Sequence, residues 1–191
     1  MVSEAARRGR PRSVSAEAAI LDTTYRLLAS TGPHATSIDA IARESGASKM
    51  TIYKWWPRRE ALLTDAFLRQ AAALLPLAEA GEPLAILRAH AGAYAKALAG
   101  DFGRVQLAVI CECISSTGSA TEFSERYLRA RRERGMAIIT AGQTDGSIRG
   151  TLPAGDLWDQ LYGTLFYQSS FGLRAVTPAY ARRLVDSVLA A

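Results

Sequence analysis

The sequence predicts an all-α protein. Alanine, which has the highest helix propensity, occurs 35 times, whereas the β-branched residues isoleucine and valine occur only 10 and 7 times. The seven prolines divide the chain into intervals, and within these intervals apolar residues recur with the period of a helix face. The apolar–polar alternation of a half-buried strand is absent from the sequence.

Four helices are expected in the N-terminal third, each between a capping residue and a breaking residue. Serine and threonine accept hydrogen bonds from the free amides of a first turn, while glycine and proline end helices. The first helix is expected between Ser15 and Gly32-Pro33, and the second between Thr36, with Asp39 as its capping-box partner, and Gly46. The third is expected between Ser48 and Pro57, and the fourth between Arg58 and Pro76.

Five further helices are expected in the remainder of the chain. Pro83 and Thr177-Pro178 are typical of first turns, because proline lacks the amide hydrogen that a first turn leaves unbonded. In order, the five are one from Pro83 to Leu98, one through Leu107, Ile110, Cys111 and Ile114 to Gly118, one over Glu122–Gln143, one over Leu157–Ser169, and one from Thr177 through Val188.

Residues 36–56 contain two short expected helices joined by a glycine turn, which is the pattern of a helix-turn-helix. Gly46 suits the turn, since a left-handed backbone there would strain any residue with a Cβ. The second short helix begins with Ser48 and Lys49 and so offers polar groups outward. This pattern predicts DNA binding.

Basic charge is concentrated at the N-terminus. The chain has a formal charge of +5, and residues 1–64 carry ten basic and six acidic side chains, against thirteen and twelve in residues 65–191. This asymmetry indicates a polyanionic partner. Residues 8–12, Arg-Gly-Arg-Pro-Arg, resemble the core of an AT-hook, and we expect Arg8, Arg10 and Arg12 to enter a narrow minor groove. The alternative is a basic tail that attracts DNA diffusely.

Several other classes of protein are excluded by composition. The longest apolar runs are far shorter than the roughly 18 to 20 residues that span a bilayer, and residues 1–12 lack the apolar stretch of a signal peptide. Two cysteines are too few for a disulfide scaffold, so we expect a cytoplasmic protein. Cys111 and Cys113 point to different sides of a helix, and His34 and His90 have no partners at metal spacing, so neither a metal nor a cofactor is expected.

The segment TSIDAIARESGASKMTIYKWWPRREALLTDAF resembles the helix-turn-helix signature of the tetracycline-repressor (TetR) family of bacterial transcription regulators. Two positions depart from the family pattern: Arg59 stands where lysine is usual, and Met50 where a small residue is common. The matching positions are Thr36, Ile38, Ile41, Ala42, Gly46, Ser48, Thr51, Ile52, Tyr53, Trp56, Glu60, Ala61 and Leu62.

The resemblance, together with side-chain chemistry, implies which residues contact DNA. Lysine donates to guanine and a methyl group suits thymine, so Lys49, Met50, Thr51 and Lys54 are expected in the major groove. Phosphate contacts, which set the register without reading bases, are expected from Tyr53, Ser37, Ser48 and Lys54. The alternatives are that Tyr53 is a core aromatic and that Lys54 is a solvated charge.

The resemblance also implies three parts of the chain: a basic arm over 1–12, a DNA-binding domain over 13–64, and a larger helical domain over 65–191 that dimerises through its last two helices and holds an effector. Apolar and aromatic walls suit a hydrophobic small molecule. The candidate lining residues, for each of which core packing is the alternative, are Tyr94, Leu98, Leu107, Cys111, Ile114, Tyr127, Trp158, Tyr162 and Phe166.

Two charged features have less specific interpretations. Glu112 could hold a cationic ligand, although a solvent-facing position is the simpler expectation. The arginines at 126, 129, 131, 132 and 134 alternate with Glu125 and Glu133, which favours a salt-bridged helix face over a second nucleic-acid patch.

The function that these observations predict is a ligand-responsive DNA-binding regulator, a repressor that a small hydrophobic effector releases from a palindromic operator. Two alternatives are a DNA-binding protein without an effector and an all-helical enzyme. The sequence contains no phosphate-binding glycine loop, H-E-x-x-H or G-x-S-x-G motif, which argues against the enzyme.

Overall fold

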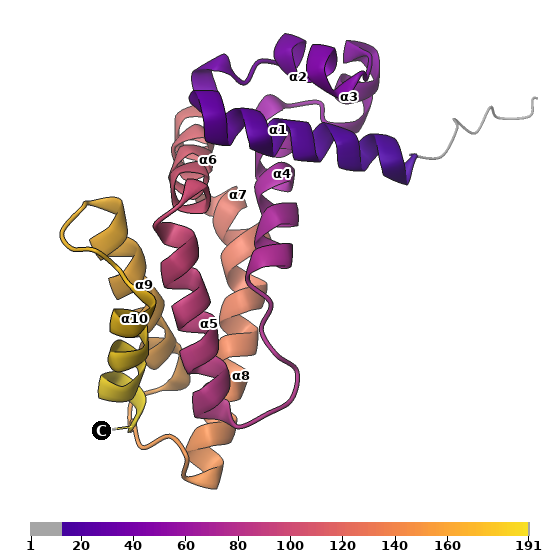
Figure 1. Ribbon diagram of the computed structural model, residues 1–191. Helices are drawn as coiled ribbons and strands as arrows, with labels where there is room; N and C mark the ends of the chain where they lie inside the picture. Colours follow the sequence, from indigo (N-terminus) through magenta and orange to yellow (C-terminus); the bar gives the residue numbers. More distant parts are fainter. Residues whose placement is uncertain (1–12, 191) are drawn as a thin grey trace, which may run out of the picture.

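The computed structural model describes residues 13–190, which form a helical bundle with a three-helix unit, residues 14–55, lying across one end (Figure 1). This part of the chain contains no β-strand, so the predicted all-α fold is confirmed. None of its helices is both long and apolar enough to cross a bilayer. The elements are α1 (Val14–Ala35), α2 (Ile38–Ser45), α3 (Lys49–Trp55), α4 (Arg59–Leu74), α5 (Pro83–Leu98), α6 (Asp101–Thr117), α7 (Thr121–Phe123), the π-helical turn η1 (Ser124–Leu128), α8 (Arg129–Asp145), α9 (Ala154–Ser170), α10 (Pro178–Val185) and the π-helical turn η2 (Asp186–Ala190).

Helices α2 and α3 begin and end at the residue types that favour helix boundaries. Ser48 Oγ accepts a hydrogen bond from the amide of Thr51 at 3.1 Å, which satisfies a free donor of the first turn of α3. Gly46, directly after α2, has a φ of 72°, a left-handed conformation that favours glycine. Both features match the expectations from sequence and fix the turn between the two helices.

Two of the expected caps are wrong. Ser37, one residue after Thr36, caps α2 by accepting from the amide of Ala40 at 3.1 Å. Thr36 is buried and instead donates its hydroxyl proton to the Gly32 carbonyl at 2.7 Å. Helix α1 starts at Val14, so Ser15 lies inside it. Gly32 is non-helical, with φ 78° and ψ 175°, so the helix is interrupted where Gly32-Pro33 was expected to end it, and the last residues of α1 follow this kink.

Two hydrophobic cores meet along α4. Leu62 and Ala66 of α4 pack with α1, α2 and α3, whereas Leu63, Phe67 and Ala71 pack into the bundle. Because adjacent residues of one helix point to different sides, a single rigid element belongs to both cores. The expected boundary between residues 64 and 65 therefore falls inside a helix, and a displacement of α4 moves the three-helix unit with it.

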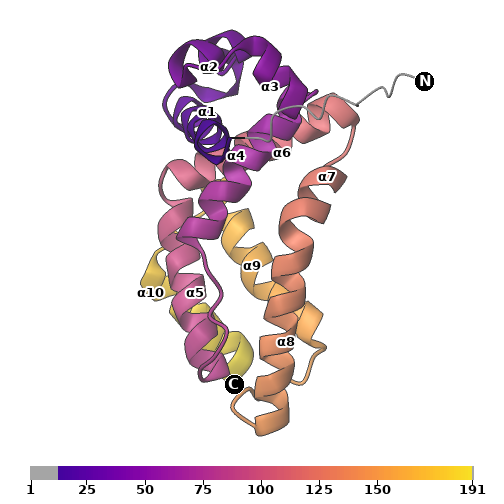
Figure 2. The same cartoon turned by 90° about the vertical axis from the view of Figure 1, so that its right-hand side faces the viewer.

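The bundle places α9 beside both α5 and α8, and α10 packs along α5 (Figure 2). A Cβ at Gly135 of α8 would lie 2.0 Å from the ring of Trp158, so the absence of a side chain there lets the indole pack against α8. Residues 121–145 run as α7, η1 and α8, in agreement with the helix expected over 122–143 except for the π-helical turn. Such turns occur frequently at functional sites.

Candidate nucleic-acid interface and ligand cavity

Helix α3 presents an outer face on which exposed polar and apolar side chains are mixed. Met50 is 80% exposed and Tyr53 is 50% exposed, while Ile52 between them is fully buried. The alternative that Tyr53 is a core aromatic is therefore wrong. The remaining candidates for DNA contact in residues 13–190 also lie on α3 or at the starts of α2 and α3: Ser37, Ser48, Lys49 and Lys54 are exposed, and Thr51 is half-buried. Arg8, Arg10 and Arg12 lie outside the described residues.

One of these candidates is held by a neighbouring helix. Lys49 Nζ lies 2.6 Å from Asp39 Oδ1 of α2, and both side chains are more than half exposed. An ion pair at this exposure contributes little to stability, so Lys49 can exchange Asp39 for a phosphate or a base at small cost.

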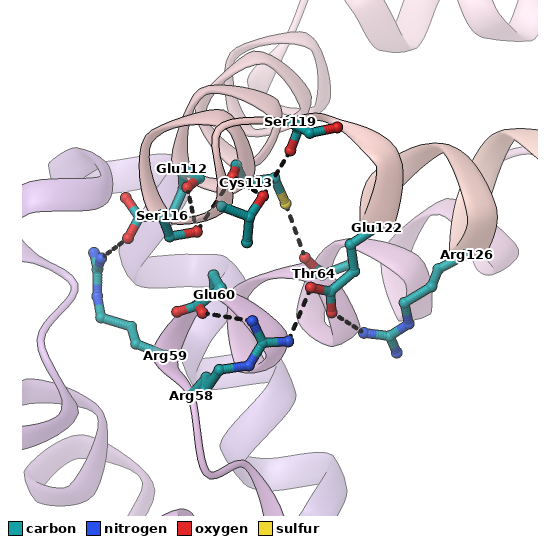
Figure 3. A network of polar contacts seen from close by, with 11 residues as sticks. Arg58, Arg59, Glu60, Thr64, Glu112, Cys113, Ser116, Ser119, Glu122 and Arg126 are labelled. Carbon is teal, nitrogen blue, oxygen red and sulfur yellow. Dashed lines mark hydrogen bonds and ion pairs between the residues drawn. The ribbon is translucent and has the colours of Figure 1, made fainter.

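The N-terminal end of α4 is tied to α6 by Arg59. Its Nε donates to the Thr36 carbonyl at 3.1 Å, one terminal nitrogen donates to the Pro33 carbonyl, and the other pairs with Glu112 (Figure 3). The planar guanidinium can reach three acceptors in different directions, which the single ammonium of the lysine usual in the resembled family cannot do equally well. Arg59 thus joins the corner between α1 and α2 to α6, and Glu112 has a partner within the chain.

A second polar chain connects the end of α3 with η1. The indole Nε1 of Trp56 donates to Asp65 of α4 at 2.7 Å, and Asp65 also pairs with Arg126 of η1. Arg126 lies 3.6 Å from Glu122, which accepts from Arg58 at 3.1 Å (Figure 3). Trp56, at the C-terminal end of α3, is therefore linked through the Asp65 carboxylate to η1.

A cavity of about 410 Å³ lies among α5, α6, η1, α8 and α9. Its walls are mainly apolar and aromatic, as in small-molecule sites. Five of the nine residues suggested by the sequence line it, namely Tyr94, Tyr127, Trp158, Tyr162 and Phe166. The other lining residues are Leu75, His90, Gln106, Ile110, Ala120, Phe123, Ser124, Leu128, Arg131, Arg132, Asp159 and Gly163.

The other four suggested residues do not line this cavity. Leu98 is buried in the core of the bundle, and Leu107, Cys111 and Ile114 are exposed on α6. Helix α6 carries apolar residues on two faces, so its periodicity alone does not identify the buried one. The face that packs inward is the opposite one, with Phe102, Val105, Val109 and Cys113.

Three polar groups of the cavity form a series of hydrogen bonds that was not predicted from the sequence. His90 Nε2 lies 3.3 Å from a terminal nitrogen of Arg131, and His90 Nδ1 lies 2.6 Å from the Tyr162 hydroxyl. Because arginine only donates, Nε2 must be the accepting nitrogen, so the proton is on Nδ1 and is donated to Tyr162. The available signal was that His90 shares a helix face with Leu87, Ala91 and Tyr94.

These groups are neutral near pH 7, apart from Arg131. Burial, followed by the positive charge of Arg131, lowers the pKa of His90 to about 4. Burial raises the pKa of Tyr127 to about 12 and also raises the pKa values of Tyr94 and Tyr162. The chain from Arg131 to Tyr162 therefore holds a single positive charge.

The arginine run is salt-bridged, with one exception. Arg126, Arg129, Arg132 and Arg134 each pair with a carboxylate. Arg131 makes no ion pair within residues 13–190; it donates to the Ala71 carbonyl at 2.9 Å and the Leu75 carbonyl at 2.8 Å, at the C-terminal end of α4. Among the same residues, no group of His, Cys, Asp and Glu could hold a metal ion.

Two family models match this chain. Residues 20–66 match the model described as "Bacterial regulatory proteins, tetR family", and residues 77–188 match "Tetracyclin repressor-like, C-terminal domain". The two matches correspond to the helix-turn-helix and to the helices that surround the cavity.

Individual proteins are similar over almost the whole chain. The uncharacterised HTH-type transcriptional regulator YdeS of Bacillus subtilis is 32% identical over 179 residues, covering 94% of this chain and 90% of YdeS. The crystal structure of the TetR family transcription regulator SCO0332 has a TM-score of 0.75 and 26% identity, covering 91% of this chain and 96% of that one. The structure of AibR in complex with isovaleryl coenzyme A and operator DNA shares the fold, with a TM-score of 0.64, 17% identity, and 91% and 97% coverage.

The buried neutral His90 predicts a pH dependence of stability. The pKa of His90 is lower in the folded protein than the 6.5 of an exposed histidine, so the unfolded chain binds the proton first and stability falls as pH falls from 6.5 towards 4. Between pH 7 and pH 5 the free energy of unfolding should decrease by about 2 kcal/mol more in the wild type than in His90→Gln. Urea unfolding at both pH values measures this difference. An equal decrease in the two proteins would contradict the neutral histidine.

Proposed function

The chain belongs to the TetR family of bacterial regulatory proteins, and we propose that it is a repressor that a small apolar effector releases from a palindromic operator. In this proposal residues 13–64 bind DNA, and residues 65–191 dimerise and hold the effector. The protein works on DNA and hence in the cytoplasm. The observation that carries the proposal is the polar connection between Trp56, the C-cap residue of α3, and the turn that lines the cavity.

The DNA contacts follow from the exposed face of α3. Lys49, Met50, Thr51 and Lys54 read bases in the major groove, where donors and methyl groups distinguish base pairs. Tyr53, Ser37 and Ser48 bind phosphates, with Lys54 as a further phosphate contact. The arm, through Arg8, Arg10 and Arg12, enters the adjacent minor groove.

The dimer forms through α9 and α10. Tyr167, Phe171 and Leu173 are each more than half exposed at the end of α9, and such clustered apolar exposure is typical of interaction surfaces. A two-fold dimer presents two copies of α3 to half-sites one helical turn, or a multiple of it, apart. A palindromic operator follows from this symmetry.

The effector acts through α4. Cavity residues Tyr127 and Leu128 belong to η1, and their neighbour Arg126 holds Asp65 of α4. A ligand that displaces η1 changes this contact, and with it the position of α4 and the distance between the two α3 helices of a dimer. AibR, of the same fold, has been crystallised with isovaleryl coenzyme A and operator DNA, so a protein of this fold can hold a small molecule as well as DNA.

We expect DNA affinity to depend on Lys49 and Tyr53. The operator is first selected from random double-stranded DNA with the full-length protein. Lys49→Ala and Tyr53→Ala should each weaken binding by about 1 to 3 kcal/mol in fluorescence anisotropy, and Lys54→Ala, which removes the charged phosphate contact, should flatten the salt dependence by about one unit of slope. Lys96→Ala, an exposed lysine on α5, is the matched control and should bind as the wild type does. Wild-type affinity in a Lys49→Ala/Tyr53→Ala double variant would refute the assignment of α3.

Filling the cavity should alter regulation. Ile110 lines the cavity, whereas Leu107, one turn earlier on α6, is 38% exposed and lies outside it. Ile110→Trp should therefore either release operator DNA without a ligand or abolish release by a cell extract that releases the wild type. Leu107→Trp should behave as the wild type in both assays. Normal binding and normal release by Ile110→Trp would show that this cavity is not the effector site.

A further inference from the structure

We propose that the effector is a small apolar organic acid whose carboxylate is held by Tyr162 and Arg131. This inference rests on the proposed function, because it names the class of molecule that fills the same cavity. It depends on the directions of the hydrogen bonds at one end of the cavity and on the charge of that end.

Tyr162 has a hydroxyl proton to donate. The Nδ1–H of His90 already occupies an acceptor position of the Tyr162 oxygen, at 2.6 Å, and within residues 13–190 no other group bonds to that hydroxyl. A phenol that accepts from histidine keeps its own proton free. Since Tyr162 lines the cavity, the matching ligand group is a hydrogen-bond acceptor.

Arg131 and Tyr127 add further donors at the same end. Three of the five N–H groups of Arg131 are used, by Ala71, Leu75 and His90, and the other two have no partner among the described residues. The guanidinium carbon lies 5.0 Å from the centre of the Tyr127 ring, and the Tyr127 hydroxyl makes no hydrogen bond to a described residue. Several donors and few acceptors favour a group with two acceptor oxygens.

Charge selects an anion over a neutral or cationic group. Arg131 makes no ion pair within residues 13–190, whereas Arg132, which also lines the cavity, is bound by Asp159 at 2.8 Å. A carboxylate beside Arg131 would form the charge-assisted pair that the chain itself does not supply. An ammonium group would meet a like charge instead. A single uncompensated cation matches a monocarboxylate better than a phosphate dianion.

The remaining walls define the rest of the molecule. Ile110, Phe123, Leu128 and Phe166 line the cavity and offer no hydrogen-bonding side chains. A hydrocarbon chain or an aromatic ring beyond the carboxylate would bury apolar surface there. The ligand is therefore amphipathic, with one acidic end and an apolar body.

An acid in this position would also compete for Arg131. The guanidinium donates to the Ala71 carbonyl, which also accepts from the Leu75 amide, and to the carbonyl of Leu75, the C-cap residue of α4. A carboxylate that draws Arg131 towards the cavity weakens this hold on α4. The head group of the ligand thus acts on the helix that carries the three-helix unit.

Direct binding to the full-length protein tests the ligand class without DNA. Isothermal titration calorimetry compares hexanoate, octanoate, decanoate and phenylpropanoate with octanol, octylamine, phenylpropanol and phenylpropylamine. At least one acid should bind about tenfold more tightly than its matched alcohol and amine, as expected for hydrogen bonds to a charged group. Equal or tighter binding of the matched alcohol or amine, or no binding by any acid, would overturn the proposal.

A pair of conservative variants locates the carboxylate. Tyr162→Phe removes one hydroxyl and should weaken binding of the acid about tenfold. Tyr25→Phe, on α1 and outside the cavity, should not change it. Undiminished acid binding by folded Tyr162→Phe would contradict the assignment, and the wild-type comparison stands by itself if that variant does not fold. Operator release by the alcohols or amines and not by the acids would overturn the proposed ligand class but not the proposed repressor function. Acid binding without operator release would overturn the proposed repressor function but not the ligand class.

Discussion

The arrangement of the molecule depends on how α4 is held. Its two faces belong to two different cores, and an arginine holds each of its ends: Arg59, the first residue of α4 itself, and Arg131 of α8. At the N-terminal end Arg59 binds the corner between α1 and α2 together with Glu112 of α6, and at the C-terminal end Arg131 of α8 binds two backbone carbonyls. Because a packed helix moves as a unit, a displacement of either end of α4 moves the whole helix.

In the proposed mechanism, this constraint is what would let a ligand in a cavity remote from α3 change the position of α3. Arg131 is shared between the cavity and the end of α4, and Asp65 is shared between η1 and Trp56. In the proposed mechanism a ligand group competes for Arg131 directly, because Arg131 lines the cavity, whereas the Asp65 contact changes only when the ligand displaces η1. An effector shifts the equilibrium only by the difference in its affinity for the two arrangements, typically about 1 to 3 kcal/mol, and the rearrangement of a few such contacts is of this size.

The sequence was sufficient for the elements with strong local signals and insufficient where tertiary packing decides. Gly46, Ser48 and Pro83 define helix ends through local chemistry, Gly46 and Pro83 through the backbone and Ser48 through its hydroxyl, and the structure has them as expected. Which face of α6 packs into the core could not be predicted from the sequence, since both of its faces carry apolar residues. The hydrogen bonds that join Arg131, His90 and Tyr162 were not predicted, because the sequence shows only a histidine on an apolar helix face and one arginine among several. The three residues come together only where α5, α8 and α9 pack against one another.

The central claim is that the cavity and the operator are linked through α4, and thermodynamic reciprocity tests it most directly. The affinity of the protein for its selected operator is measured with and without a saturating acid that binds the cavity. The affinity for that acid is measured with and without the operator. The account predicts that each ligand weakens the other by the same factor, about 5- to 150-fold. An acid that fills the cavity and leaves operator affinity unchanged would contradict it.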